Sequence, residues 1–422
     1  MSGRRVVVTG LGAVTPVGND VAATWRALLD GRSGGAPITK FDAEKFAVRF
    51  ACEVKDFDTG LYMDRKEAKR ADLYTQYALA ASVQAMQDAG FGDGTGPGSG
   101  YVPEDTGVII GSGIGGLRTM EEQHANYLAQ GPRRISPFFV PMFISDIAAG
   151  IVSMRFGCKG PNFATVSACS TSAHAVGVAA RAVQYGEADV MLAGGSEAAV
   201  TPMAIGGFAS MGALSQRNDS PETASRPFDA TRDGFVLGEG AGVVVLEALD
   251  HALARGARIY GELAGYAATG DAYHLTGQPE AHEGLQRSMR RALKDAGLTP
   301  EQVDYVNAHG TSTPLNDPNE ARAIRAVFGD HADALSVSST KSATGHMLGA
   351  AGVVELIACA KAMEEGCVPP TINHTTPDPE ITLDVTPNQP RERKITVALS
   401  NSSGFGGHNA TVILRAYDGA QG

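Results

Sequence analysis

Hydrophobic residues in this chain fall into two alternating kinds of segment. Short apolar runs rich in β-branched residues, such as VVVT, GVII and VVVLE, are typical of strands that are buried on both faces of a sheet. Longer segments of helical character lie between them. We expect strands at 5–9, 107–110, 190–193, 242–247, 303–307, 334–338 and 395–400, and helices at 21–30, 71–90, 172–186, 284–296, 318–328 and 348–365. This alternation predicts an α/β protein whose sheets are covered by helices.

Two segments of the chain are similar to each other. Residues 165–190 and residues 336–368 each run from a predicted strand, through a turn rich in Ser and Thr, into a helix of small residues. We therefore expect a duplicated chain, with a first half at 1–255 and a second half at 256–422. Segments 92–100 and 373–393, which are rich in Gly, Asp or Pro, are predicted to be surface loops.

Composition narrows the class of protein. The chain has 422 residues, of which 43% are hydrophobic and 19% charged, so it is long and apolar enough to bury a large core. A formal net charge of −11 argues against a nucleic-acid partner, which would need a basic surface. The apolar run after Arg4 and Arg5 is short and interrupted by Gly and Pro, and no run approaches the length of a membrane span. We expect a soluble protein without a membrane partner.

The five cysteines are scattered and form no CxxC pair, which is typical of a reducing compartment such as the cytoplasm. Cys169 stands apart because it follows residues 165–168, which can extend a strand, and precedes a predicted helix. The positive end of that helix and its free N–H groups would favour the reactive thiolate, and the N–H of Cys169 can face a developing oxyanion. A buried structural cysteine is the alternative. That interpretation is adopted for Cys52, Cys158, Cys359 and Cys367.

Two histidines lie where predicted strands give way to turns. The strand of VDYVNAHGTSTP ends at His309, which is followed by glycine and several hydroxyl residues. His346 follows Lys341 in the segment SSTKSATGHMLGAAG, which leads into a helix of small residues. A histidine at a strand end, next to glycine, is placed to act on a ligand rather than to fill a core. Either histidine taken alone is equally compatible with a structural role.

A glycine-rich segment indicates a different class of protein. GSGIGG at residues 111–116 follows a predicted strand and fits the pattern G-x-G-x-x-G. By itself this pattern favours an NAD-dependent oxidoreductase. The acidic residue expected about 20 positions further on, at the end of a second strand, is not evident. The dinucleotide site therefore stays an alternative.

Taken together, Cys169, His309, Lys341 and His346 resemble the functional residues of the β-ketoacyl synthase family within the thiolase-like superfamily. The resemblance extends from VVVTGLGAVTPVG to NSSGFGGHNATVIL and includes SACSTS, RPFDATRDGFVLGEGAG, NAHGTSTPLND and STKSATGHMLGAAG, in that order. It implies a thiolase-like fold, duplicated and layered α-β-α-β-α. The sequence is most similar to the elongating branch, often called synthase II, which takes acyl chains from acyl carrier protein.

The resemblance implies a decarboxylative condensation in fatty-acid elongation. Cys169 would accept an acyl group as a thioester, and malonyl-acyl carrier protein would then lose carbon dioxide to give an attacking enolate. His309 and His346 would supply positive hydrogen-bond donors to that enolate, and Lys341 would tune their protonation. The N–H groups of Cys169 and Phe405 would form the oxyanion hole. No metal or redox cofactor is implied.

Further roles follow from the same resemblance. Asp317, Glu320 and Glu355 would support the network of charged and polar groups around the histidines. Thr311 and Thr313 would hydrogen-bond the phosphopantetheine arm of the carrier, although without the resemblance they would be interpreted as ordinary turn residues.

The acyl chain and the carrier protein would meet separate surfaces. Ile114, Phe208 and Phe405 match positions of the acyl pocket, and Phe405 also matches a gating ring. A charge run is often only a solvated face, but a basic cluster would suit an acidic carrier protein. The residues of this cluster are Arg65, Lys66, Lys69, Arg70, Arg133 and Arg134.

The sequence departs from the family at two positions. Ser403 stands where elongating synthases usually carry phenylalanine, and a smaller polar group beside Phe405 would widen or wet the pocket or loosen the gate. Gly212 stands where some relatives carry an arginine that binds the carrier. The departure at Ser403 leaves the preferred length of the acyl chain open.

Alternatives also remain for assembly and pathway. Some family members lack the cysteine and only set chain length for a partner, but the presence of Cys169 with both histidines favours an active enzyme. The enzyme would form a homodimer, or a heterodimer with a subunit resembling a chain-length factor. The alternative pathway is a type II polyketide or polyene synthesis, in which this chain would be the ketosynthase.

Overall fold

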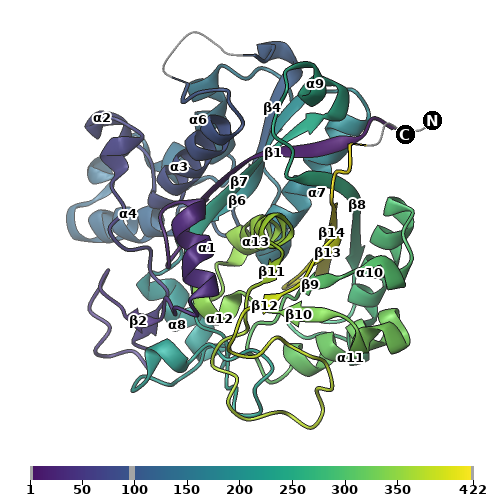
Figure 1. The fold of residues 1–422 in the computed structure, drawn as a ribbon. Coiled ribbons are helices and arrows are strands. Elements are labelled where there is room, and N and C mark those ends of the chain that lie inside the picture. Colours follow the sequence, from purple (N-terminus) through teal and green to yellow (C-terminus); the bar gives the residue numbers. More distant parts are fainter. Residues whose placement is uncertain (1–2, 95–99, 420–422) are drawn as a thin grey trace.

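The chain is organised around one mixed β-sheet (Figure 1). The computed structural model describes residues 3–94 and 100–419, so residues 95–99 of the predicted loop 92–100 lie outside the described residues. Within the described ranges the strand order is β10-β9-β13-β14-β8-β1-β7-β6-β4-β5. The strands of this sheet are β1 (Val6–Val14), β4 (Thr106–Gly111), β5 (Asn162–Phe163), β6 (Val190–Glu197), β7 (Gly240–Ala248), β8 (Gly261–Gly270), β9 (Tyr305–Asn307), β10 (Ser336–Ser338), β13 (Val397–Gly404) and β14 (His408–Arg415). Two short ribbons pair β2 (Ala36–Pro37) with β3 (Phe50–Ala51) and β11 (Cys367–Val368) with β12 (Arg391–Glu392).

The same pairing pattern occurs on both sides of the contact between β1 and β8. On one side β1 is antiparallel to β7 and β7 to β6, while β6, β4 and β5 run parallel. On the other side β8 is antiparallel to β14 and β14 to β13, while β13, β9 and β10 run parallel. Between the two patterns, β1 pairs with β8 only at Val7 with Glu262 and Val8 with Gly261. The second pattern therefore repeats the first.

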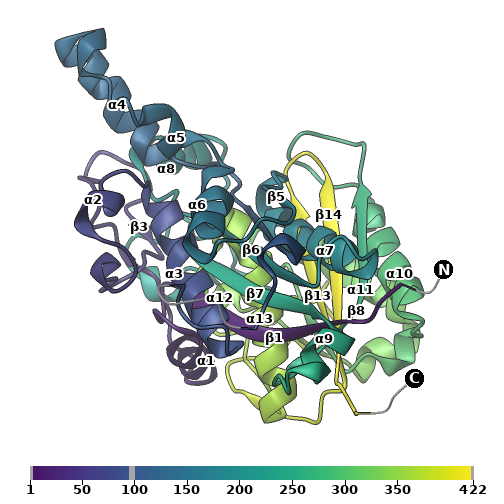
Figure 2. The same cartoon turned by 90° about the horizontal axis from the view of Figure 1, so that it is seen from above.

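Helices cover the outer faces of both patterns and also fill the space between them (Figure 1). Helices α3 and α6 pack on the first pattern, α10 and α11 on the second, and α7 and α13 lie between the two. Five layers, α-β-α-β-α, result, which confirms the predicted fold. Helix α4 projects away from this body (Figure 2). The helices are α1 (Val21–Leu29), α2 (Arg65–Ala68), α3 (Leu73–Asp88), α4 (Leu117–Gln130), α5 (Phe139–Phe143), α6 (Ile147–Phe156), α7 (Thr171–Gln184), α8 (Pro202–Ser210), α9 (Leu249–Ala254), α10 (Glu283–Ala296), α11 (Asn316–Phe328), α12 (Lys341–Thr344) and α13 (Ala351–Glu365).

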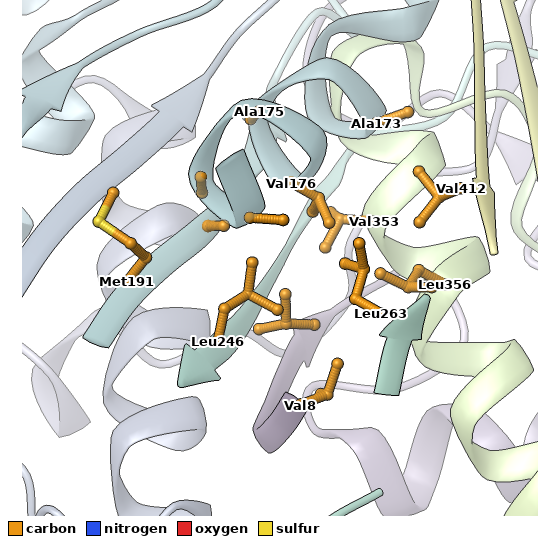
Figure 3. Packing of buried hydrophobic residues seen from close by; sticks show 14 of the residues in the cluster. Val8, Ala173, Ala175, Val176, Met191, Leu246, Leu263, Val353, Leu356 and Val412 are labelled. Carbon is orange, nitrogen blue, oxygen red and sulfur yellow. The ribbon is translucent and has the colours of Figure 1, made fainter. Parts of the chain in front are cut away.

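The central layer is built from small and branched side chains (Figure 3). Ala173 and Val176 of α7 and Val353 of α13 lie in one buried cluster with residues of β1, β6, β7, β8 and β14. The two helices approach closely, since a Cβ added at Gly352 would lie 3.1 Å from the backbone nitrogen of Ala173. Such packing depends on residues with little side-chain volume. It brings the N-terminal ends of α7 and α13 together, and the site is built at these ends.

Glycines explain where the strand pattern was predicted too short. The strand predicted at 5–9 continues to Val14 because Gly10 and Gly12 lie under α3. A Cβ at Gly12 would come within 1.9 Å of the carbonyl oxygen of Ala81 on that helix. Gly265 of β8 lies under α10 in the same way, since an added Cβ would lie 2.5 Å from the carbonyl oxygen of Ala292. These glycines permit close helix–sheet contact and do not end the strands.

Every predicted strand and helix has a counterpart in the structure, with ends that differ by a few residues. Among the described elements of eight residues or more, the pattern missed strands β8 and β14 and helices α4, α6 and α8; it also missed several shorter elements. Helices α6 and α8 are apolar and contain glycine, so they lack the polar stripe that marks a surface helix. The predicted loop 373–393 is irregular apart from β12 near its end. Among the described helices, none combines the length and the apolar composition that crossing a bilayer would require.

Candidate active site

A cavity of about 460 Å³ opens where the N-terminal ends of α7 and α13 meet the ends of the strands. Its walls come from both halves of the chain. Predicted site residues that line it are Ile114, Cys169, Phe208, His309, Thr311, Thr313, His346 and Phe405. Ser403 and Gly212, the two positions of departure, line it as well. The predicted residues of the supporting network do not line the cavity.

Cys169 lies in a single turn of 3₁₀ helix, η4 (Ala168–Ser170), directly before α7. The expectation of an extended strand at 165–168 is wrong, because Ala168 has a left-handed backbone with φ of 50°. The side chain of Thr171 holds this turn by accepting from the N–H of Ser167 at 2.9 Å and donating to the carbonyl of Ala168 at 2.8 Å. The turn fixes the direction of the thiol at the start of the helix.

Burial governs the protonation of Cys169. The side chain is buried, and loss of hydration raises its pKa to about 12. The charge of Lys341 and the backbone N–H of Phe405 act in the opposite direction but do not compensate. The backbone N–H groups at the helix start do favour the thiolate, as expected, but burial outweighs them and keeps the thiol protonated at neutral pH. A Cβ at Gly404 would lie 3.1 Å from the nitrogen of Cys169, so the end of β13 packs directly on the turn.

His309 and His346 are neighbours in the cavity. Their ring centroids are 5.4 Å apart and the rings are nearly perpendicular, at 86°. Phe235 contacts His346 edge to face, with centroids 5.4 Å apart. Burial first, and then the charge of Lys341, hold the pKa of both histidines well below its usual range. The rings are uncharged at neutral pH, so the expectation of positively charged donors is wrong.

Lys341 and Glu355 form a buried ion pair behind the histidines. Lys341 is the first residue of α12 and Glu355 lies on α13. Burial raises the pKa of Glu355 to about 7, against the opposing charge of Lys341. One oxygen of Glu355, Oε2, is buried without a hydrogen-bond partner among the described residues. The pair fixes a positive charge close to both histidines and to Cys169.

Glu320 and Asp317, on α11, hold the loop that carries His309. Glu320 accepts from the N–H groups of His309 at 2.8 Å and Gly310 at 2.7 Å. Asp317 accepts from the N–H of Phe228 at 2.8 Å and from that of Ser312 at 3.2 Å. Burial raises the pKa of Asp317 to about 6. These carboxylates fix the backbone of the loop and do not touch the cavity.

The hydroxyls of Thr311 and Thr313 lie 3.0 Å apart on the same loop, at the cavity wall. On another wall Phe208 lies against Phe235, with ring centroids 5.3 Å apart, and near Phe405, at 6.5 Å. Ile114 belongs to the same apolar cluster as Phe208 and Cys169. The cavity thus has an apolar side next to the thiol and a hydroxyl-bearing side.

Ser403 is buried beside Phe405, and its hydroxyl makes a hydrogen bond. It donates to Oδ1 of Asn409 at 2.9 Å, and Nδ2 of Asn409 donates to Oδ1 of Asp271 at 2.6 Å. The N–H of Asp271 in turn donates to the carbonyl of Gly407 at 2.9 Å. This chain of hydrogen bonds ties the turn that carries Phe405 to the segment after β8.

The predicted basic cluster forms an exposed surface outside the cavity. Arg70 stacks over the ring of Phe138, with 4.3 Å between the guanidinium carbon and the ring centroid, and so links α2 to the segment after Arg134. Arg134 also donates to Gln130 of α4 at 2.8 Å. All six residues of the basic cluster are exposed, namely Arg65, Lys66, Lys69, Arg70, Arg133 and Arg134.

Several residues that line the cavity were not predicted as site residues. They are Asp271, His282 and Leu348, of which Leu348 lies within the motif STKSATGHMLGAAG. His282 is buried in a left-handed conformation with φ of 46°.

Another residue that was missed, Glu197, excludes the dinucleotide alternative. It accepts from the N–H groups of Gly113 and Ile114, which a bound pyrophosphate would need.

Comparison with known proteins agrees with this geometry. The family model "Beta-ketoacyl synthase, N-terminal domain" matches residues 3–252, and "Beta-ketoacyl synthase, C-terminal domain" matches residues 260–375. The chain belongs to the β-ketoacyl synthase family. A curated relative from Synechocystis sp., named 3-oxoacyl-[acyl-carrier-protein] synthase 2, is 53% identical over 414 residues, which cover 98% of each chain.

Solved structures of ketosynthases have the same fold. One is titled as a type II PKS acyl-carrier protein in complex with its ketosynthase bound to the hexaketide. It superposes with a TM-score of 0.91 and is 38% identical, covering 99% of this chain and all of the other. Another, titled the ishigamide ketosynthase/chain length factor, has a TM-score of 0.90 and is 37% identical, covering 98% of this chain and all of the other.

Proposed function

We propose that this chain is a 3-oxoacyl-[acyl-carrier-protein] synthase that lengthens acyl chains in fatty-acid synthesis. It joins an acyl group held on Cys169 to malonyl-acyl carrier protein, with loss of carbon dioxide. The observation that carries the proposal is that Cys169, His309 and His346 share one cavity, backed by a full-length relative of that name.

In the first step the acyl group moves from the carrier to Cys169. The thiol sulfur attacks the thioester carbonyl, and the carrier thiol leaves with the proton of Cys169. The N–H groups of Cys169 and Phe405 stabilise the oxyanion that forms during this attack. The charge of Lys341 opposes the effect of burial and eases loss of the thiol proton.

In the second step the malonyl group loses carbon dioxide. The electron pair of the broken bond enters an enolate, whose oxygen accepts hydrogen bonds from the uncharged rings of His309 and His346. The enolate carbon attacks the acyl carbonyl, the bond to Cys169 breaks, and the sulfur takes up a proton from solvent, which replaces the proton that left with the carrier thiol. The product is an acyl chain two carbons longer on the carrier. Glu320, Asp317 and the pair of Lys341 with Glu355 act by positioning these groups.

Acyl carrier protein is the proposed partner. Thr311 and Thr313 line the wall that would contact the phosphopantetheine arm, and the basic cluster would contact the acidic carrier. A structural neighbour is titled as a ketosynthase in complex with such a carrier. We assign Ile114, Phe208 and Phe405 to the acyl pocket because they line the apolar side of the cavity.

We also propose that two copies of the chain pair through the edge of the sheet at β5. Phe163 and Val166, at this edge, have 44% and 62% of their surface exposed, and Met154 on α6, which contacts β5, has 72%. Monomers rarely expose so many large apolar residues in one region. We also assign the protein to the cytoplasm, because its five cysteines are all unpaired. We divide the chain into two halves at residue 255.

A type II polyketide ketosynthase is the second candidate, supported by the titles of the structural neighbours and by the polar Ser403. The two candidates differ in the acyl groups they extend. Offering the enzyme saturated acyl carriers of increasing length, and 3-oxoacyl carriers, separates them by which products appear.

Intact-protein mass spectrometry tests the main proposal. Incubation with acyl-carrier protein should add one acyl group to the wild-type chain and none to Cys169→Ala. Cys359→Ala, which changes another buried cysteine, is the matched control and should still be acylated. An adduct that persists in Cys169→Ala would overturn the assignment.

A further inference from the structure

Glu197, the last residue of β6, is a fully buried carboxylate that the reaction scheme does not use. It accepts four hydrogen bonds, and two reach each of its oxygens. Oε1 accepts from the hydroxyl of Ser112 at 2.8 Å and the N–H of Ile114 at 3.2 Å. Oε2 accepts from the N–H groups of Gly113 at 2.8 Å and Gly349 at 3.0 Å. Every donor comes from one of two turns that border the cavity.

The two turns belong to different halves of the chain and press against each other around this carboxylate. A Cβ at Gly113 or at Gly349 would come within 2.8 Å of Oε2 of Glu197. A Cβ at Gly349 would also lie 2.5 Å from the nitrogen of Gly113. Only glycine backbones permit such an approach. The carboxylate therefore joins the turn after β4 to the turn before α13.

Each turn presents one apolar side chain to the cavity, next to Cys169. Ile114 is bonded to Glu197 through its own N–H, and Leu348 directly precedes the bonded Gly349. Leu348 has a left-handed backbone, with φ of 45°, which needs support from its surroundings. Glu197 supplies that support. The positions of both walls thus depend on one acceptor group.

The set of donors suits a carboxylate and no other side chain of this size. A carboxylate only accepts hydrogen bonds, and here three N–H groups and one hydroxyl converge on it. A glutamine would turn an NH₂ group toward one of the two donor pairs. Burial raises the pKa of Glu197 to about 7, so the group is charged at pH 8, where its charge raises the pKa of the Cys169 thiol.

We propose that Glu197 is a positioning residue that fixes Ile114 and Leu348 relative to each other and thereby determines which acyl chain lengths Cys169 accepts. This inference rests on the proposed function, because it assumes that the apolar side of the cavity holds the acyl chain. It assigns a specificity role to the glycine-rich segment 111–116.

The test compares acylation rates of Cys169 by acyl carriers of two to sixteen carbons. Glu197→Gln should flatten the profile, lowering the ratio between the best and the worst chain at least fivefold. Glu247→Gln is the matched control, because Glu247 is also a buried carboxylate, on the neighbouring strand β7, but its partners Thr9 and Arg255 lie away from the cavity. The control should keep the wild-type profile. If Glu197→Gln changed the acylation rate by the same factor for every chain length, the preference for chain length would be unchanged and the inference would be overturned.

A second measurement, the alkylation rate of Cys169, does not require acyl carrier protein. Because the charge of Glu197 opposes ionisation of Cys169, iodoacetamide should alkylate Cys169 about threefold faster in Glu197→Gln at pH 8. Ser112→Ala removes only one donor and should shift the profile in the same direction if Glu197→Gln does not fold. An unchanged chain-length profile in Ser112→Ala would then overturn the inference. Failure of the wild type to become acylated would instead refute the proposed function.

Discussion

His309 and His346 meet edge to face with ring centroids 5.4 Å apart, and both are uncharged although a buried lysine lies behind them. An uncharged imidazole can donate a hydrogen bond through one nitrogen without giving up its proton. This is the property that an enolate requires, since a strongly acidic donor would protonate the carbanion before it attacks. Burial, and then the nearby charge of Lys341, keep the rings in this state.

Loss of one histidine should separate the two steps of the reaction. His346→Ala should still accept an acyl group on Cys169, but condensation should fall at least ~100-fold because one donor to the enolate is gone. Mass spectrometry measures the first step, and release of carbon dioxide from malonyl-acyl carrier protein measures the second. His331→Ala, which changes a histidine that does not line the cavity, is the control and should leave both steps unchanged. Normal turnover of His346→Ala would contradict the proposed role.

Replacing Lys341 should lower both the free energy of unfolding and the rate of condensation, and a second substitution can separate these two effects. Lys341→Met leaves Glu355 buried and unpaired, so the free energy of unfolding should fall by about 3–5 kcal/mol. Adding Glu355→Leu removes the uncompensated charge and should restore most of that stability. Condensation should stay low in the double variant, because the charge beside the histidines is absent. Denaturant unfolding and turnover measure the two effects, and wild-type turnover of the double variant would refute the role of the charge.

Burial of His346 predicts a dependence of stability on pH. Below its usual pKa near 6.5, the unfolded chain binds a proton at this residue while the native chain, with its lowered pKa, does not. The stabilising contribution is therefore present above about pH 6.5 and is lost as the pH falls toward the native pKa. Relative to His346→Gln, the wild-type free energy of unfolding should decrease by about 1.4 kcal/mol per pH unit between about pH 6 and pH 5. The difference should be constant above about pH 7.5.

Ser403 should matter through its hydrogen bond to Asn409. Ser403→Ala leaves Oδ1 of Asn409 without this donor, and the free energy of unfolding should fall by about 1–3 kcal/mol. Ser402 is a matched control on the same strand, because its buried hydroxyl has no partner among the described residues. Ser402→Ala should be neutral or stabilising. Equal effects of the two substitutions in denaturant unfolding would contradict the importance of the bond.

Charge reversal tests the proposed carrier surface. Lys66→Glu with Lys69→Glu should raise KM for acyl-carrier protein about tenfold, equivalent to about 1.4 kcal/mol of binding energy. The difference should shrink at high salt, and KM for a small acyl-pantetheine should not change. Arg287→Glu reverses another exposed charge, on α10, and serves as the control. Equal sensitivity of carrier-bound and free pantetheine substrates would rule out a docking role.

The fold was largely predictable because buried strands and small-residue helices leave a strong pattern. The prediction failed where the tertiary contact, and not the local pattern, decides the conformation. The strand predicted at 5–9 was too short, because it stopped before Gly12, which is the place where α3 packs on β1. Residues 165–168 have strand-like composition, but the bonds of Thr171 impose a turn.

The site was predictable only in part, for a similar reason. Cys169, His309 and His346 stand in recognisable motifs, and the structure places them in one cavity. Their protonation was not predictable, because it depends on burial that no motif reports. Glu197 was missed because its four donors come from segments far from it in the chain.

Because the strand pattern is repeated, the residues of the active site are distributed over two related parts of the chain. The two N–H groups proposed for the oxyanion, those of Cys169 and Phe405, belong to different repeats, and both histidines lie in the second. In the proposed mechanism the two repeats therefore have different roles: the first carries the acyl group on Cys169, and the second provides the histidines that stabilise the enolate. Neither unit alone holds a complete reaction centre, so any change in how they dock at the central helices alters the chemistry itself.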